Sequence, residues 1–266
     1  MKLGLFGRPV AHSASPRLFA ALGRILNRKI EYEAVRVDGP LSAAVEAARA
    51  KGWRGASVTI PFKLEASELA GGLTSQARAV GAVNVLRFDA KLAGHNTDAD
   101  GLADALRGAG IAVKGRVVLI FGARGAAAAA GWACGKEGAK TVRFVNRTPA
   151  TARRLARTLA PAFPKTRYSA GVAVNADVWI NATPLGQGDN NESPVPPELK
   201  APLAAVDLVY GKVTPFQRRA ADAGATVIDG TAMLVHQALR AWEFWDKPLA
   251  PAKRAEIAEE LIEELS

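Results

Sequence analysis

A short segment in the middle of the chain has the residue types and spacing that bind a dinucleotide pyrophosphate. An apolar run at residues 117–121 is followed by Gly122-Ala123-Arg124-Gly125-Ala126-Ala127. A glycine at 122 permits a tight turn, and a residue no larger than alanine at 127 lets a helix pack close to a sheet. Free N–H groups at the start of that helix bind phosphate oxygens. The segment therefore predicts cofactor contacts from Gly122, Ala123, Arg124, Gly125 and Ala126.

Arg124 departs from the usual pattern of this turn. It stands where G-x-G-x-x-G/A has its second glycine, which normally lets the backbone approach the phosphates. Three readings remain open at this point. Gly125 takes over the close approach, or Arg124 binds phosphate through its guanidinium group, or the site is degraded.

The residues after the next apolar run indicate which dinucleotide is bound. A carboxylate about 20 residues beyond the glycines would bind the adenosine ribose hydroxyls and indicate NAD. Residues 141–145 are followed instead by Asn146-Arg147-Thr148, with no acid. The planar fork of an arginine suits a 2′-phosphate, so we predict NADP, held by these three residues. The alternative is an ordinary βαβ layer with a surface Arg-Thr turn.

Polar residues in the first hundred positions provide a second set of candidates. Ser13 and Ser15 precede a proline and predict a helix start, where two hydroxyls can either cap the helix or bind a carboxylate. Lys63 follows a strand-like segment that stops at Pro61, which places a cation at a strand end unless it is a solvated surface lysine. Asn84 interrupts a strand-like run.

Asp98 lies in a turn that leads into a helix. Its side chain could do no more than cap that helix. Neither Asp98 nor Lys63 decides a function by itself, and a pair of this kind acts only if tertiary structure brings the two side chains together.

Composition restricts the class of protein. The 266 residues are 49% hydrophobic and 23% charged, as in ordinary globular proteins, with room for two modest domains. No apolar run is long enough to span a bilayer, so we expect a cytoplasmic protein with no membrane partner. The single Cys134 excludes an internal disulfide framework, and three histidines without metal-ligand spacing argue against a metal site.

The net charge of +10 raises the question of nucleic acid. The basic residues are mostly scattered, and no nucleic-acid-binding motif accompanies them. We therefore expect the positive field to attract small anionic ligands such as a phosphorylated cofactor or a carboxylate substrate.

Short strands alternate with helical patterns along the chain, which indicates an α/β fold. Strands are expected at residues 2–6, 32–37, 55–60, 117–121, 141–145, 178–184, 205–209 and 226–230. Helices are expected at residues 41–51, 102–107, 126–138 and 150–159, and from 232 to the C-terminus. The polar, proline-rich residues 187–197 predict a mobile loop near the cofactor.

Seven segments, taken in order, resemble the shikimate dehydrogenase family. They are G-R-P-V-A-H-S-A-S-P at 7–16, S-V-T-I-P-F-K at 57–63, G-A-V-N at 81–84, N-T-D-A-D-G at 96–101, N-R-T at 146–148, I-N-A-T at 180–183 and G-T-A-M-L-V-H-Q-A at 230–238. The resemblance implies an oxidoreductase that interconverts 3-dehydroshikimate and shikimate with NADPH, in the chorismate pathway of aromatic amino acid biosynthesis. It also implies an N-terminal α/β substrate domain, a Rossmann-like NADP-binding domain and a C-terminal helix that returns to the substrate domain. The expected boundaries are 1–101 with 238–266 for the first and 102–237 for the second.

The resemblance also assigns roles to individual residues. Lys63 and Asp98 are expected to be the catalytic pair. The expected substrate contacts are Ser13 and Ser15 for a carboxylate and Thr59, Asn84 and Gln237 for ring hydroxyls. Tyr210 is expected near the carboxylate and the nicotinamide, and Ser57 is a further expected substrate contact. Thr183, Gly230 and Met233 are expected to contact the cofactor. The protein is expected to be a monomer or a homodimer.

Two departures leave other functions open. The family usually has asparagine where this chain has Ser57, which leaves the polyol undecided and admits a sibling dehydrogenase for quinate or an aminoshikimate. Arg124 leaves the affinity for the cofactor undecided and admits a catalytically weak NADP-binding regulatory protein.

Overall fold

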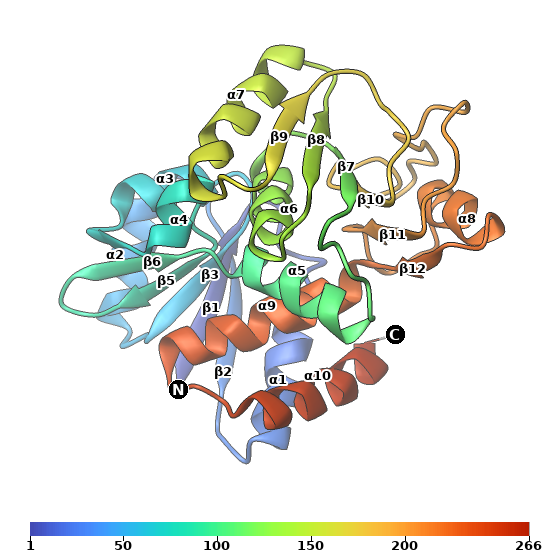
Figure 1. The fold of residues 1–266 in the computed structure, drawn as a ribbon. Helices are drawn as coiled ribbons and strands as arrows, with labels where there is room; N and C mark the ends of the chain where they lie inside the picture. The colour runs from blue at the N-terminus through green and yellow to red at the C-terminus, as the bar shows by residue number, and fades with distance from the viewer. Residues whose placement is uncertain (266) are drawn as a thin grey trace. The chain divides into compact units, whose positions relative to one another are not determined.

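A computed structural model describes residues 1–265, which form two compact units (Figure 1). The first unit comprises Met1–Thr97 and Gln237–Leu265, and the second comprises Asp98–His236. The predicted α/β class and the return of the C-terminal segment to the first unit are both confirmed.

The first unit is built on a mixed sheet. Its strand order is β2-β1-β3-β5-β6-β4. Strands β1, β2 and β3 are parallel, whereas β5 runs antiparallel to both β3 and β6. The strands are β1 Lys2–Gly7, β2 Glu31–Arg36, β3 Gly55–Val58, β4 Gly72–Leu73, β5 Val85–Phe88 and β6 Leu92–His95.

Helices and large aromatic side chains cover both faces of this sheet. A Cβ atom at Gly4 would lie 2.1 Å from the Trp53 ring, and one at Gly55 would lie 2.3 Å from Nε1 of Trp245. The two glycines are on opposite faces, because Gly4 pairs with Ala56 and Leu3 pairs with Gly55. Each face is therefore close-packed under a tryptophan, and one of these comes from the C-terminal segment.

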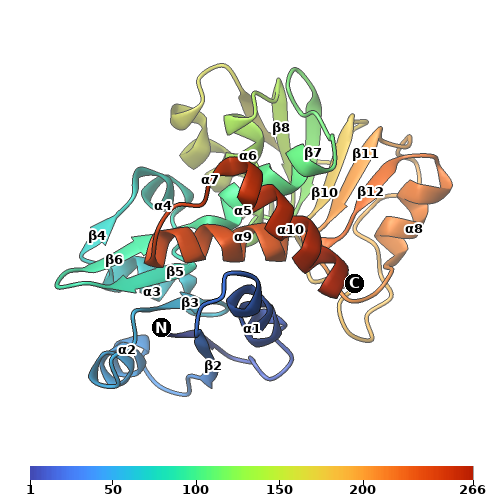
Figure 2. The ribbon, with the colours of Figure 1, turned by 90° about the horizontal axis from the view of Figure 1, so that it is seen from below.

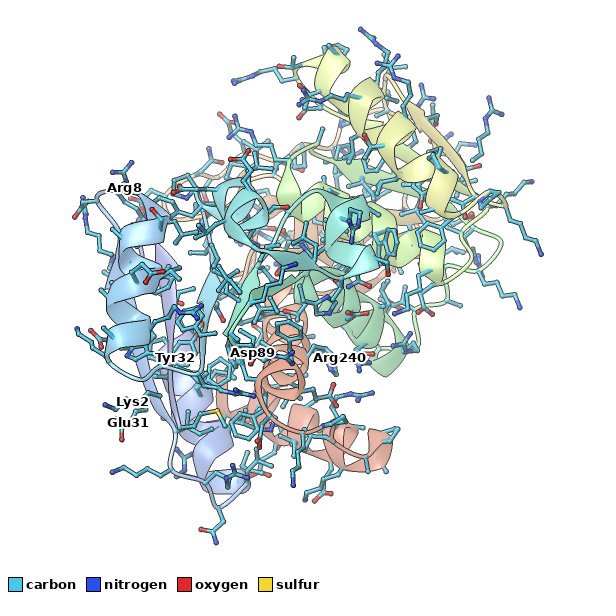
Figure 3. The ribbon with its side chains drawn as sticks, turned by 90° about the vertical axis from the view of Figure 1, so that its left-hand side faces the viewer. Lys2, Arg8, Glu31, Tyr32, Asp89 and Arg240 are labelled. Atoms are coloured by element: carbon cyan, nitrogen blue, oxygen red, sulfur yellow. The ribbon has the colours of Figure 1, made fainter. Side chains whose placement is uncertain are left out.

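The helices of the first unit are mostly short. They are α1 Ser15–Ile25, α2 Leu41–Ala50, α3 Lys63–Leu69, α4 Ser75–Val80 and α10 Pro251–Leu265, with the second half of α9 Gly230–Trp245. Helices α1 and α10 lie side by side (Figure 2), and the ion pair between Arg24 and Glu264 joins them at 2.8 Å. At the sheet edge, Lys2 and Glu31 are register partners and lie close together (Figure 3).

The second unit has an all-parallel sheet with the order β12-β11-β10-β7-β8-β9. Its strands are β7 Val117–Phe121, β8 Thr141–Val145, β9 Arg167–Ala170, β10 Val178–Asn181, β11 Ala204–Asp207 and β12 Thr226–Ile228. Counted from β7, this is the order 3-2-1-4-5-6 of a Rossmann fold. The strand order reverses between β7 and β10, and ligands bind outside the carboxyl ends of the strands at such a point.

The helices of the second unit precede, connect or follow these strands. They are α5 Thr97–Gly108, α6 Gly125–Lys136, α7 Pro149–Leu159, the 3₁₀ helix Ala160–Ala162, α8 Pro215–Asp222 and the first half of α9. Helices α6 and α7 pack on the β7–β9 half of the sheet, and α8 packs on β11 and β12 (Figure 1).

Most expected elements are present, and the differences have local causes. The strand expected at 178–184 ends at Asn181, because the Asn181 side chain accepts a hydrogen bond from the Thr183 N–H and turns the chain. The strand expected at 226–230 ends at Ile228, since Gly230 starts α9. Helices α3 and α4 were missed, because seven and six residues are too few for a clear helical period.

The segment between β10 and β11, expected to be a mobile loop, has no helix or strand among the described residues. Its second half is anchored by Arg219 on α8. This guanidinium group donates hydrogen bonds to the carbonyl oxygens of Val195, Pro197 and Leu199 at 2.9–3.1 Å and lies over the Trp179 ring. Three bonds from one side chain therefore hold a stretch that carries no regular structure of its own.

Among residues 1–265, no helix is long and apolar enough to cross a membrane. The same residues contain no group of three or more histidine, cysteine or carboxylate side chains that could hold a metal ion.

Candidate active site

The glycine turn lies at the point where the strand order of the second unit reverses. Gly122 has φ of +115°, a conformation that L side chains rarely adopt. A Cβ atom there would lie 2.8 Å from the carbonyl oxygen of Ala182, at the end of β10. Glycine is thus required both for its backbone conformation and for the close approach of the two strand ends.

The start of α6 is available to phosphate oxygens. Its N-cap is Arg124, whose side chain does not cap the helix. The N–H groups of the first turn have no partner inside a helix, and they carry the positive end of the helix dipole. Ala127 is fully buried, which confirms the prediction of close packing between this helix and the sheet.

The backbone at Arg124 explains how a larger residue replaces glycine. With φ of −102° and ψ of −165°, position 124 is extended and imposes no strain on arginine. The side chain is exposed and is not part of any ion pair among residues 1–265. An exposed guanidinium group therefore stands beside the glycine turn.

The end of β8 carries Asn146, Arg147 and Thr148. The Asn146 amide donates to the carbonyl oxygen of Thr148 at 3.0 Å, which closes a turn just before α7. Arg147 is exposed, and within the described residues it makes no ion pair. Its guanidinium group thus remains available to an anionic ligand.

Three more predicted cofactor or substrate residues follow strands of the same unit. Thr183 comes after β10, Tyr210 comes after β11 with 41% of its surface exposed, and Gly230 comes after β12. The Gly230 N–H donates to the carbonyl oxygen of Val209 at 3.1 Å, which holds the ends of β11 and β12 together. Met233 is half-buried on α9, one turn beyond Gly230.

In the first unit, Ser13 and Ser15 lie at the start of α1, beyond the carboxyl end of β1. The N-cap residue is Ala14, whose side chain makes no capping hydrogen bond. The Ser13 hydroxyl accepts a hydrogen bond from the Ser15 N–H at 3.3 Å. Ser15 is buried and Ser13 is half-buried.

Backbone hydrogen bonds bring Thr59, Lys63 and Asn84 together in the first unit. The Thr59 N–H donates to the carbonyl oxygen of Phe6, and the Val58 N–H donates to that of Asn84 at 2.7 Å. The carbonyl oxygen of Lys63, the first residue of α3, accepts from the Val83 N–H at 2.9 Å. Residues distant in sequence therefore meet at one end of this sheet.

Asn84 is part of a buried polar network. Its Oδ1 accepts from the Thr97 N–H at 2.7 Å, and its Nδ2 donates to the Thr97 hydroxyl at 2.9 Å and to Oε1 of Gln237 at 3.4 Å. The network fixes both polar ends of the asparagine side chain. It also fixes Thr97, the residue before Asp98. Asp98 is itself buried and is the first residue of the second unit.

Tyr32 is a polar residue that the sequence did not single out. Its ring stacks on Phe19 of α1 at 4.2 Å, and Figure 3 shows it within the first unit. Its hydroxyl is buried without a hydrogen-bond partner among the described residues. Burial raises the pKa of Tyr32, while the nearby hydroxyls of Ser57 and Ser15 lower it in part. The sequence pattern gave no reason to select Tyr32, because a tyrosine that points into the core is ordinary in a strand.

The strand order, the glycine turn and the uncapped helix define a dinucleotide-binding protein of the Rossmann class, with a second α/β unit of its own. Residues 5–86 match the model of the shikimate dehydrogenase substrate binding domain. The shikimate dehydrogenase (NADP(+)) of Rubrobacter xylanophilus is 39% identical over an alignment of 274 positions that covers 95% of this chain and 94% of that protein. The chain therefore belongs to the shikimate dehydrogenase family.

Solved structures agree with this assignment. The shikimate 5-dehydrogenase of Thermus thermophilus, in complex with NADP(H) and shikimate, is similar with a TM-score of 0.87 and 33% identity, covering 98% of this chain and 99% of that one. The 5-ketofructose reductase of Gluconobacter sp. strain CHM43 has a TM-score of 0.83 and 28% identity, covering 98% of both chains. The same fold is thus found in proteins named for different substrates.

Proposed function

We propose that this chain is an NADP-dependent dehydrogenase that interconverts 3-dehydroshikimate and shikimate. The observation that carries the proposal is the Rossmann-order sheet of the second unit, whose turn at its crossover point fits a pyrophosphate, in a chain of the shikimate dehydrogenase family. The same family includes the Thermus thermophilus structure that binds NADP(H) and shikimate.

Three features of the second unit fit NADP. A Cβ atom at Gly122 would fill the space where the turn meets Ala182, and the first turn of α6 has no side-chain cap. The end of β8 carries exposed Arg147 and no carboxylate. Backbone N–H groups of residues 123–126 would bind the pyrophosphate, and Asn146, Arg147 and Thr148 would bind the 2′-phosphate. Thr183, Gly230 and Met233 would contact the nicotinamide end.

Lys63 and Asp98 are proposed as the catalytic pair. Bound NADPH supplies a hydride to the carbonyl carbon of the substrate. Negative charge develops on the carbonyl oxygen at that moment, and the Lys63 ammonium group donates a proton to it, leaving a hydroxyl and a neutral amine. Asp98 would accept a hydrogen bond from a substrate hydroxyl and orient the ring. In the oxidative direction Lys63 accepts the hydroxyl proton.

The first unit offers a carboxylate receptor and a polar set for ring hydroxyls. Ser13 precedes α1 and Ser15 begins it, and the Tyr32 hydroxyl lies near Ser15 and Ser57 with no hydrogen-bond partner among the described residues. A substrate carboxylate would satisfy these donors. Thr59, Asn84 and Gln237 would meet ring hydroxyls, and Tyr210 is proposed as a further substrate contact.

The first experiment measures the initial rate of NADP+ reduction by shikimate, beside the same assay with NAD+. Lys63→Ala should lower kcat by orders of magnitude with a modest change in KM for shikimate, since a proton donor acts in the transition state. Lys29→Ala is the matched control, because that lysine side chain is 87% exposed on the same unit. Unchanged turnover in the Lys63 variant would remove the catalytic assignment.

Cofactor choice is tested at the end of β8. Arg147→Ala should weaken NADP+ relative to NAD+ by roughly 10- to 100-fold, as expected for loss of one charge-assisted contact. Arg153→Ala removes an equal charge from an exposed position on α7, and should leave the preference unchanged. Equal effects of the two substitutions would indicate a general positive field rather than a specific contact.

The second candidate function is a dehydrogenase for another cyclic polyol acid. It is favoured by Ser57, which is shorter than the amide usual in the family, and by the similarity to a 5-ketofructose reductase. Comparable kcat/KM values for quinate or an aminoshikimate and for shikimate would support it. NADPH binding without turnover of any of these compounds would instead support a catalytically weak NADP-binding regulatory protein.

A further inference from the structure

The last residues of β10 and β11 form a buried polar pair at the carboxyl edge of the Rossmann sheet. Asn181 and Asp207 are register partners, and both are completely buried. The Asn181 amide donates to Oδ1 of Asp207 at 2.9 Å. The other residues of β10 and β11 are apolar, so two buried polar side chains at this place require a reason.

The Asp207 carboxylate accepts hydrogen bonds on both oxygens. Oδ1 also accepts from the Val209 N–H at 3.1 Å. Oδ2 accepts from the Thr214 hydroxyl at 2.5 Å and from the Gln217 amide at 3.3 Å. No cation pairs with Asp207 in the described part of the chain. Burial raises the pKa of this carboxyl group, and its four neutral donors lower it in part.

These hydrogen bonds lead to the residues proposed to bind the nicotinamide end. Asn181 connects Asp207 to the loop after β10. Its Oδ1 accepts hydrogen bonds from the N–H of Thr183 at 3.0 Å and from the Thr183 hydroxyl at 2.6 Å. Through Val209 the hydrogen bonds of Asp207 fix the residue before Tyr210, and the carbonyl oxygen of Val209 accepts from the Gly230 N–H. One carboxylate thus connects three loops at the same edge of the sheet.

We infer that Asp207 is a positioning residue for hydride transfer. It fixes the positions of Thr183, Tyr210 and Gly230 and does not itself touch the substrate or the cofactor. The inference rests on the proposed function and adds a residue to it. Burying an unpaired carboxylate costs free energy, whereas four donors that converge from a strand end, one loop and a helix restrict the motion of the loop ends. Precise placement of the reacting groups is the gain, since a shift of about 1 Å can cost roughly 100-fold in rate.

The test compares two carboxylates at opposite edges of the same sheet. Asp207→Asn replaces one acceptor oxygen with a donor that faces donors. Asp177→Asn is the matched control, because Oδ2 of Asp177 accepts from the Val117 N–H at 2.8 Å just before β10, away from the carboxyl edge. Each variant is measured for thermal unfolding, kcat, affinity for NADPH and affinity for adenosine 2′,5′-bisphosphate, which probes the Arg147 end alone.

For Asp207→Asn we expect kcat to fall about 10- to 100-fold and the affinity for NADPH to weaken, with binding of adenosine 2′,5′-bisphosphate retained. For Asp177→Asn we expect only a lower unfolding temperature. If Asp207→Asn fails to fold, Asn181→Leu breaks the connection to Thr183 while leaving the Thr214 and Gln217 bonds in place, and the same pattern is expected.

Wild-type kcat and NADPH affinity in a folded Asp207→Asn variant would overturn the inference. So would an equal loss of NADPH and adenosine 2′,5′-bisphosphate binding, which indicates a purely structural role. If the wild-type protein turns over no polyol, the proposed function fails, and the two binding affinities still decide the role of Asp207.

Discussion

Replacing Gly122 with alanine tests whether close approach at the crossover point is needed for stability and for the cofactor. The methyl group would meet the Ala182 carbonyl oxygen at 2.8 Å and its carbon at 3.1 Å, in a backbone conformation with φ of +115°. Positive φ costs about 1–2 kcal/mol for alanine. Forcing the strand ends apart adds about 1–3 kcal/mol, by analogy with overpacking. Gly122→Ala should therefore lose about 2–5 kcal/mol in total.

Gly138→Ala separates the two contributions. Gly138 has φ of +79°, but the nearest atom to an added Cβ is Cγ of Lys114 at 3.5 Å, an ordinary contact. We expect a loss of about 1–2 kcal/mol from backbone strain alone. At roughly 3 °C per kcal/mol, calorimetry should resolve the two variants.

The functional readout is NADPH affinity, measured by nicotinamide fluorescence. Gly122→Ala should weaken the affinity for NADPH at least about tenfold, because the displaced loop carries the proposed pyrophosphate contacts. A loss of about tenfold is what the loss of one good phosphate contact costs. Gly138→Ala should leave it unchanged. Equal losses of stability in the two variants would refute the close-approach argument, and unchanged NADPH affinity in Gly122→Ala would place the cofactor elsewhere.

Three further predictions follow from single buried groups. Burial raises the pKa of the Cys134 thiol to about 12, so the native protein should react with a disulfide reagent at pH 8 roughly a thousandfold more slowly than a free thiol, and rapid labelling of native protein would contradict this. Because the pKa of Asp207 is raised on folding, the unfolding free energy of the wild type relative to Asp207→Asn should rise as pH falls from neutral towards 4, in urea titrations; a difference that falls in acid would exclude burial as the dominant cause. Trp245→Phe removes the hydrogen bond from Nε1 to the Leu86 carbonyl oxygen, 2.9 Å long, and should cost about 1–3 kcal/mol in urea unfolding, whereas no loss would mean that the orphaned carbonyl finds water.

The sequence by itself determined the local chemistry of the Rossmann unit. An apolar β-branched run, a glycine and small residues specify a strand, a turn and a close-packed helix, because each depends on neighbours within about ten residues. Gly122 and Ala127 were identified for the reasons that the structure confirms, a positive φ and complete burial. The NADP preference was also predicted from three consecutive residues at the end of one strand.

Tertiary structure decided what depends on residues distant in the chain. The sequence left Arg124 unresolved, and only the extended backbone at that position explains why arginine is tolerated there. Tyr32 and Asp207 looked like ordinary strand residues, since their partners lie on other strands and helices. A strand pattern specifies which face a side chain occupies, but hydrogen-bond partners follow from strand order and register, which local periodicity does not contain.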